Sequence, residues 1–169
     1  LYLGRFEQVK NPNRLIKAWK GVDQRLVMVG EGTLKAQSQN LIEDLNMSDQ
    51  ISLRPETSNI SELFSKAKAL LISSDREGSP KVLFESLCCG VPVLSTKCGI
   101  MGDLLPSNCL AEVDDESFKN LISRWINNTS ELEKMQKPCF EKVKNENLLS
   151  IQAEKVNTIY QDLLSKESK

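Results

Sequence analysis

The stretch SSDREGSPKVLFESLCCGVPVLST, residues 73–96, indicates the fold of this chain. It joins a polar turn to an apolar run that predicts a helix from about Pro80 to Cys89, and Gly90 ends that helix. A short apolar strand follows over residues 92–96. A helix that leads directly into a strand in this way is typical of a parallel α/β sheet.

The same alternation of short apolar strands and helices continues on both sides of this stretch. Before it, we expect strands over residues 1–3, 25–30, 51–54 and 69–73, separated by helices over residues 11–20, 33–46 and 60–67. After it, we expect a weaker strand over residues 109–113 and helices over residues 115–127, 130–144 and 148–164. The sequence therefore predicts a doubly wound α/β domain, in which helices cover both faces of a parallel sheet.

The composition limits the possible functions. A chain of 169 residues, 40% of them hydrophobic, fits a single soluble globular domain. The 22 basic and 23 acidic residues give no overall field that would attract nucleic acid, which argues against a dedicated DNA-binding protein. No apolar stretch is long enough to span a bilayer. The chain starts with LYLGRF, without Met and with a strand that runs directly into a loop, so we expect a further domain N-terminal to it.

Histidine is absent, which excludes a catalytic triad or general base built on histidine within this chain and removes the commonest metal ligand. We therefore expect no catalytic metal. The five cysteines lack C-x-x-C spacing and mostly lie in apolar runs, which predicts reduced thiols packed as small hydrophobic residues in a cytoplasmic protein. They are Cys88, Cys89, Cys98, Cys109 and Cys139.

Charged residues and glycine-containing turns gather where the predicted strands end. They are Gly4, Arg5 and Lys10 after the first strand, Gly30, Glu31 and Gly32 after the second, Arg54 and Pro55 after the third, and residues 75–79 after the fourth. The carboxyl ends of parallel strands share one edge, so cations, turn amides and a helix N-terminus would form a phosphate site there. A second interpretation stays open, in which Arg5 and Lys10 are solvated loop charges and the glycines only permit a tight turn.

Two glutamates of the opening stretch point to a ligand with hydroxyl groups. Glu85 lies in the run of residues 82–89, which is otherwise apolar except for Ser86, so its carboxylate should be at least partly buried. Burying an ionised carboxylate without partners costs on the order of several kcal/mol. A ribose would satisfy it, and an internal salt bridge or a solvent-facing orientation are the alternatives. Glu77 precedes the helix, whose cap we expect at Ser79, and would suit the hydroxyls of a sugar.

Glu77 and Glu85 have seven residues between them, and SLCCGVPVLST follows. This order resembles the E-x7-E motif and the EAMACGVPVV continuation of the retaining GT-B glycosyltransferases of family 4, the group 1 transferases. LYLGRFEQVKNPNRLIKAW and RLVMVGEGTL resemble the opening strands of that family, so the resemblance covers nearly the whole chain. It implies the Rossmann-like C-terminal half of a GT-B fold, in which residues 1–169 form a single nucleotide-sugar-binding domain and a preceding domain binds the acceptor.

The resemblance also implies a role for each candidate residue. The catalytic residues would be Arg5 and Lys10, which bind the donor diphosphate, and Glu77, which holds hydroxyls of the transferred sugar. Glu85 would bind the ribose. The other substrate-binding residues would be Arg54 and Pro55 beside the base, with Gly4, Gly78, Ser79, Lys81 and Val82 along the sugar and phosphates. Pro80 departs from many relatives because it has no N–H to direct at the donor.

The implied activity is transfer of a sugar, with retention, from a nucleoside-diphosphate sugar to a hydroxyl of an acceptor glycan or lipid-linked glycan. UDP is favoured over GDP or ADP. No metal or other cofactor is implied, because cationic side chains stabilise the departing diphosphate. The enzyme would act in polysaccharide or glycolipid synthesis, in the cytoplasm or at the cytoplasmic face of the membrane, and the isolated domain would be inactive. A non-catalytic nucleotide-binding module, or a phosphorylase or epimerase of the same architecture, remains an alternative.

Overall fold

The computed structural model describes residues 1–146 and residue 157. Its strands are β1 Tyr2–Leu3, β2 Leu26–Val29, β3 Ile51–Arg54, β4 Leu70–Ile72, β5 Val93–Thr96 and β6 Leu110–Ala111. Its helices are α1 Pro12–Ala18, α2 Lys35–Asp44, α3 Ile60–Lys66, α4 Lys81–Cys88, α5 Met101–Leu104, α6 Asp115–Trp125 and α7 Thr129–Glu146, with 3₁₀ turns η1 Gln8–Lys10 and η2 Ser107–Cys109. Apart from residue 157, the helix expected over residues 148–164 lies outside the described residues.

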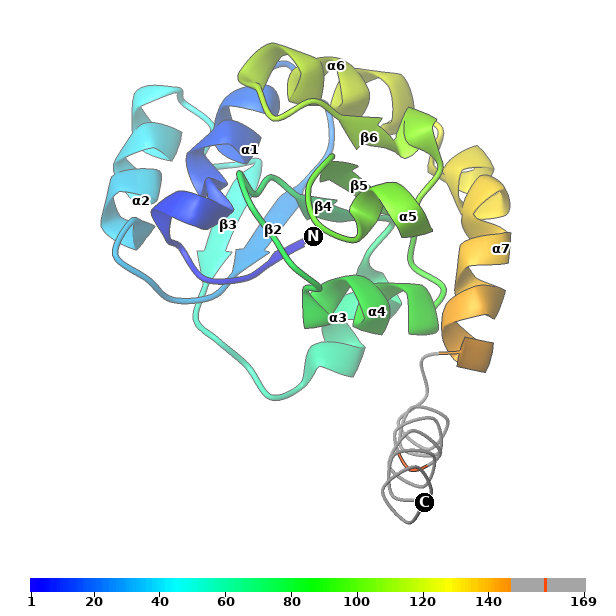
Figure 1. Cartoon of the computed structure of the whole chain (residues 1–169). Coiled ribbons are helices and arrows are strands. Elements are labelled where there is room, and N and C mark those ends of the chain that lie inside the picture. The colour runs from blue at the N-terminus through cyan, green and yellow to red at the C-terminus, as the bar shows by residue number, and fades with distance from the viewer. Residues whose placement is uncertain (147–156, 158–169) are drawn as a thin grey trace.

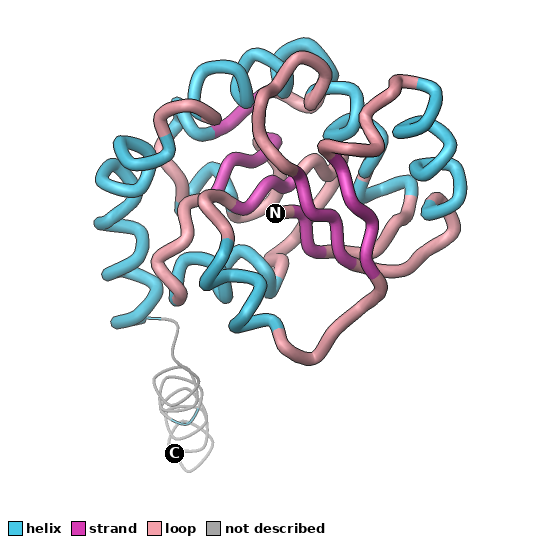
Figure 2. Tube along the Cα trace, turned by 180° about the vertical axis from the view of Figure 1, so that it is seen from behind, coloured by secondary structure: helices cyan, strands magenta, loops and turns pink. Residues whose placement is uncertain are grey.

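The strands form two parallel three-stranded sheets, β1-β2-β3 and β4-β5-β6, where the sequence predicted one sheet. Backbone hydrogen bonds connect the sheets through β1 and β4: the Leu71 amide donates to the Leu1 carbonyl at 2.8 Å, and the Leu1 ammonium donates to the Ala69 carbonyl at 2.9 Å. The strands therefore lie in the order β3-β2-β1-β4-β5-β6. Figure 2 shows the two sheets side by side from behind. The doubly wound architecture is confirmed.

Helices cover both faces of the sheets, as Figure 1 shows. One apolar cluster includes Leu15 of α1, Ile42 of α2 and Phe118 of α6, and the other contains residues of α3, α4 and α7. Strand β4 serves both clusters, because Leu71 belongs to the first while its two neighbours belong to the second. Each fully buried aliphatic side chain of this kind contributes about 1.5–3 kcal/mol, so the two clusters hold the sheet rigid beneath the loops at its edges.

The first turn of α1 shows why the chain becomes helical soon after η1. Pro12 is the first helical residue, and its fixed φ angle and missing N–H suit that position. Asn11 caps the helix, because its side chain accepts a hydrogen bond from the Arg14 amide at 3.2 Å. Asn11 also adopts the left-handed conformation, with a φ of 45°, which turns the chain sharply out of η1. This turn places η1 and Lys10 at the carboxyl edge of the sheet.

Three short elements were not predicted. The 3₁₀ turns η1 and η2 have three residues each and α5 has four, so none of them is long enough to show a helical period in the sequence. The helix cap expected at Ser79 is wrong, because the N-cap residue of α4 is Pro80 and no side chain caps that helix. Gly90 follows α4 with a φ of 72°, so its predicted role in ending the helix is confirmed.

Candidate functional site

A lysine and a glutamate from two different loops pair at the carboxyl edge of the sheets. Lys10 ends η1 after β1, and Glu77 lies in the loop between β4 and α4. The Lys10 Nζ atom donates to Glu77 Oε1 at 2.6 Å, and Ser74 Oγ donates to the same oxygen at 2.7 Å. The Lys10 and Glu77 side chains are 22% and 9% exposed, so this ion pair is largely shielded from water. The structure thus brings together two of the predicted site residues.

Further hydrogen bonds fasten the loop after β1 to the loop after β4. Ser73 Oγ donates to the carbonyls of Lys10 and Asn11, at 3.0 and 2.9 Å. The Asp75 amide donates to the Val9 carbonyl at 2.8 Å. Because these bonds involve the backbone on both sides, the position of Lys10 depends on the loop that carries Glu77, and the two loops form one unit.

Gly30 and Gly32 allow the loop after β1 to lie directly on the loop after β2. Both have a φ of 150°, and a Cβ at either position would overlap backbone atoms, of Gly4 in the first case and of Phe6 in the second. The Phe6 amide donates to the Glu31 carbonyl at 2.8 Å across this contact. The close approach of the two loops therefore requires glycine at both positions.

Gly99, in the loop after β5, supports the backbone of Glu77 from the other side. Its φ is 55°, and a Cβ there would overlap the carbonyl oxygens of Glu77 and Gly78. The Ile100 amide donates to the Gly78 carbonyl at 3.0 Å, which keeps the two loops in contact. Cys98 lies in the same contact, where burial raises the pKa of its thiol and the Glu77 carboxylate adds to that rise. Gly99 was not predicted from the sequence, because its role depends on the approach of two loops.

The N-terminus of α4 opens onto the same edge. Gly78, Ser79 and Lys81 are exposed, and Val82 is partly buried. The amides of Lys81 and Val82 belong to the first helical turn, in which N–H groups have no acceptor within the helix. These two N–H groups are therefore available to an anion, although Pro80 provides no N–H.

Glu85 is partly buried one turn further along α4, as the sequence predicted. The helix packs Leu83, Ser86 and Leu87 against the sheet, and Glu85 lies beside this buried face. Within residues 1–146 the Glu85 carboxylate has no hydrogen-bond or ion-pair partner. The internal salt bridge that was left open as an alternative is absent from this part of the chain, so the carboxylate is available to a ligand.

Within residues 1–146, no hydrogen bond or ion pair joins Arg5, Arg54 or Pro55 to the Lys10–Glu77 pair. The Arg5 side chain is exposed, and its carbonyl accepts a hydrogen bond from the Tyr2 hydroxyl at 2.8 Å. Arg54 and Pro55 are exposed after β3, and Arg54 lines a cavity of about 380 Å³ beside α3. A ligand that reached all these residues would extend along the edge of the sheet.

Sequence reasoning missed a buried arginine next to this site. Arg14 of α1 is 6% exposed and pairs with Asp75 in the loop that carries Glu77. Its signal was present in the sequence, because Arg14 directly precedes Leu15 and Ile16 in an apolar helix, as Glu85 lies among apolar neighbours in α4.

The five cysteines differ in how deeply they are buried. All five thiols are free, as predicted, and Cys109 and Cys139 are buried. Cys88 and Cys89 are exposed, so the prediction that they pack as small hydrophobic residues is wrong. They lie at the end of α4, beyond the turn that faces the sheet.

No cluster of histidine, cysteine, aspartate or glutamate in the described residues could hold a metal ion. None of the described helices combines the length and the apolar character that crossing a membrane requires.

Comparison with known proteins identifies the family. The sequence model described as "Glycosyl transferases group 1" matches residues 1–141. The chain belongs to this family. This group 1 glycosyltransferase chain is 24% identical over 97% of its length to N-acetyl-alpha-D-glucosaminyl L-malate synthase of Bacillus anthracis, and it covers 45% of that protein.

A second relative of this group 1 glycosyltransferase chain is N-acetylgalactosamine-N,N'-diacetylbacillosaminyl-diphospho-undecaprenol 4-alpha-N-acetylgalactosaminyltransferase of Campylobacter jejuni. The two are 32% identical over 85% of the chain and 40% of the relative. The chain therefore spans less than half the length of these two curated relatives.

Solved structures show the same fold at low sequence identity. Sucrose-phosphate synthase of Thermosynechococcus elongatus matches with a TM-score of 0.85 and 21% identity, over 98% of this chain and 45% of that one. HepE of Anabaena, solved in complex with UDP, matches with a TM-score of 0.79 and 18% identity, over 95% of this chain and 48% of that one. The group 1 chain thus has the Rossmann-like architecture of a GT-B domain.

Proposed function

We propose that this chain is the donor-binding domain, and the C-terminal half, of a retaining glycosyltransferase that moves a sugar from a nucleoside-diphosphate sugar to an acceptor hydroxyl. The observation that carries this proposal is the Lys10–Glu77 pair, which places a cation and a carboxylate together beside the open N-terminus of α4. A nucleoside-diphosphate sugar has both the anionic diphosphate and the sugar hydroxyls that such a pair can bind.

Each candidate residue has a distinct task in this proposal. Lys10 and the exposed Arg5 neutralise the diphosphate, and the first-turn amides of α4 add hydrogen bonds to it. Glu77 accepts from hydroxyls of the transferred sugar. Glu85 accepts from the ribose, since its carboxylate is partly buried and has no partner within residues 1–146. Arg54 and Pro55 lie further along the edge, where the base would extend.

The proposed reaction needs no metal, because side-chain cations offset the charge that develops on the departing diphosphate. Retention follows if the acceptor attacks from the face that the diphosphate leaves and the donor phosphate takes the acceptor proton. The glycosidic bond to the diphosphate then breaks, and a new one forms to the acceptor oxygen. No side chain is required as a nucleophile in this scheme.

UDP is the proposed nucleotide, and a polysaccharide or glycolipid the proposed product. Two observations on similar proteins support this: HepE was solved with UDP, and the Campylobacter jejuni relative is named for transfer to a diphospho-undecaprenol-linked sugar. A lipid-linked acceptor would bring the full-length enzyme to the cytoplasmic face of the membrane. The acceptor would bind to a domain N-terminal to this chain.

Calorimetric titration of the full-length protein tests the proposal. UDP, GDP, ADP and their glucose conjugates are titrated in the presence and absence of a chelator. We expect one diphosphate, UDP, to bind with unchanged affinity in the chelator. Loss of binding in the chelator would contradict the metal-free scheme, and no binding of any of the three would contradict the function. Binding without turnover towards any acceptor would favour a non-catalytic nucleotide-binding module.

A further inference from the structure

Arg14 contacts the loop that carries Glu77 and is almost fully buried, with 6% exposure. Its Nη1 atom donates to the Ser73 carbonyl at 2.9 Å and pairs with Asp75 Oδ1 at 2.8 Å. Its Nε atom donates to Asp115 Oδ1 at 3.1 Å. One guanidinium serves all three acceptors because its N–H groups are fixed in a planar fork, which the ammonium group of a lysine cannot reproduce.

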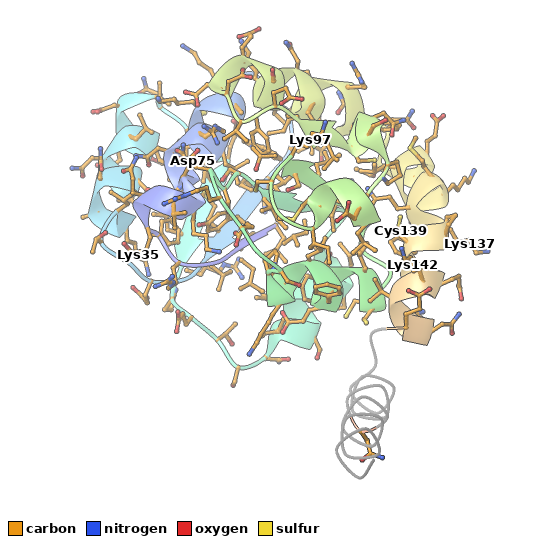
Figure 3. All side chains as sticks on the ribbon, viewed as in Figure 1. Lys35, Asp75, Lys97, Lys137, Cys139 and Lys142 are labelled. Atoms are coloured by element: carbon orange, nitrogen blue, oxygen red, sulfur yellow. The ribbon has the colours of Figure 1, made fainter. Side chains whose placement is uncertain are left out.

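These contacts connect Arg14 to both partners of the Lys10–Glu77 pair. Arg14 belongs to the first turn of α1, and the cap of that helix, Asn11, directly follows Lys10. The Asn11 Nδ2 atom also donates to Asp75 Oδ1, at 3.2 Å. Asp75 lies two residues before Glu77, and Figure 3 labels it beside α1. The guanidinium therefore ties the first turn of α1 to the loop close to the residue from which Glu77 extends.

The two carboxylates that pair with Arg14 belong to different parts of the fold. Asp75 belongs to the loop of Glu77, whereas Asp115 is the first residue of α6 and is 53% exposed. Asp115 also pairs with Lys17 at 3.3 Å, on the outside of α1. Loss of Asp115 would weaken the packing of α1 on α6 without touching the loop. Loss of Asp75 would release the loop and leave the contact between α1 and α6 in place.

We propose that Arg14 is a positioning residue of the sugar-transfer reaction. By holding Ser73 and Asp75 it fixes the loop in which Glu77 meets Lys10, and so it sets the place of the carboxylate that receives the donor sugar. The inference rests on the proposed function, and Arg14 acts through Glu77 without touching the reacting atoms. A displacement of about 1 Å at such a group can lower a rate on the order of 100-fold.

Amide hydrogen exchange of the ligand-free full-length protein gives the first test, and it needs no substrate. Arg14→Lys keeps the charge and loses the fork, so it should raise exchange over residues 73–78 by about 10-fold or more. Asp75→Asn should give the same pattern, and it serves as the second variant if Arg14→Lys does not fold. The matched control Asp115→Asn should leave residues 73–78 unchanged. Unchanged exchange there in both Arg14→Lys and Asp75→Asn would overturn the proposal.

Steady-state kinetics of the full-length enzyme give the second test, with UDP-glucose and UDP-N-acetylglucosamine as donors and release of UDP as the signal. Arg14→Lys and Asp75→Asn should lower kcat by about 10- to 100-fold and change the donor KM by less than about 3-fold. Asp115→Asn should stay within about 2-fold of the wild type. When Glu77→Gln is already present, Arg14→Lys should change the remaining rate by less than about 2-fold, because the group that it positions is gone.

Two outcomes of the kinetic test would overturn the positioning role. One is a double variant whose losses simply multiply, and the other is a loss for Asp115→Asn as large as that for Arg14→Lys. Either result would mean that Arg14 stabilises the fold as a whole and has no specific effect on the position of Glu77. If neither UDP-sugar is bound or turned over, the proposed function fails for UDP donors, and the exchange experiment still decides whether Arg14 holds the loop of Glu77.

Discussion

The Lys10 ammonium lies 2.6 Å from the Glu77 carboxylate, although the two residues are 67 positions apart in the chain. The pair is largely buried, and the Ser74 side chain also donates to the same carboxylate oxygen. Lys10 therefore stabilises the fold through its ion pair with Glu77 and, in the proposed function, also binds the diphosphate of the donor. Removing Lys10 should therefore affect both stability and donor binding, which is not expected for a solvated loop charge.

Lys10→Ala should weaken both donor binding and the fold, whereas Arg5→Ala should weaken donor binding alone. Lys10→Ala removes the ion-pair partner of the 9%-exposed Glu77 side chain, which then keeps Ser74 as a hydrogen-bond donor. The loss of the ion pair should lower the free energy of unfolding by about 1–3 kcal/mol. The exposed Arg5 side chain should change it by about 0.5 kcal/mol or less. Calorimetry with UDP and chemical denaturation measure the two effects. Equal stability of the two variants would contradict the buried pair.

Glu77→Gln should separate nucleotide binding from transfer. The amide is similar in size and can still accept from Ser74, so UDP affinity should stay within about 3-fold of the wild type. Transfer by the full-length enzyme should fall by about 100-fold or more, since the carboxylate contacts the sugar in which charge develops. A variant that transfers sugar normally would show that Glu77 only supports the loop.

Glu85→Leu should leave the ligand-free protein as stable as the wild type or more stable, by up to about 1 kcal/mol. The reason is that its partly buried carboxylate has no partner within residues 1–146, so its removal cancels a desolvation cost. UDP affinity should fall by about 10-fold, as two hydrogen bonds to ribose are lost. Glu133→Leu, an exposed position on α7, is the control and should not change affinity. An unfolded Glu85→Leu protein would mean that the carboxylate is structural.

Gly99→Ala should displace the Glu77 loop, while Gly102→Ala should not. A Cβ at Gly99 would overlap the carbonyl oxygens of Glu77 and Gly78, and the position also has a positive φ. A Cβ at Gly102 in α5 meets nothing within 4 Å. We expect Gly99→Ala to cost about 1–3 kcal/mol of stability and to lower the transfer rate. Thermal denaturation and a transfer assay compare the pair, and identical behaviour would show that this contact is dispensable.

The alternation of strands and helices could be predicted because both element types repeat their apolar residues at characteristic periods. The approach of Lys10 to Glu77 was predictable for a different reason, since the carboxyl ends of parallel strands share one edge. The division into two sheets was not predictable, because it depends on how few backbone bonds connect the two-residue strand β1 to β4.

The residues that fix the site were harder to find from the sequence. Gly99 matters because the loops after β4 and β5 touch, and no local pattern records that contact. Arg14 carried a visible sign, a charge next to Leu15 and Ile16, but its partner Asp75 lies 61 residues later in the chain. Local propensity describes elements, whereas such contacts depend on how the finished elements pack.

The central place of β1 has a consequence for the order of folding. This strand pairs with β2 nearby, yet its junction with β4 joins Leu1 to Ala69, which are 68 residues apart. Contacts of such separation require a large loop to close first and form slowly. After dilution from denaturant, a fluorescent nucleotide should therefore regain binding only in the slowest phase of the tryptophan signal. If nucleotide binding returned ahead of that phase, the loop after β1 would be able to reach its folded conformation before β1 pairs with β4.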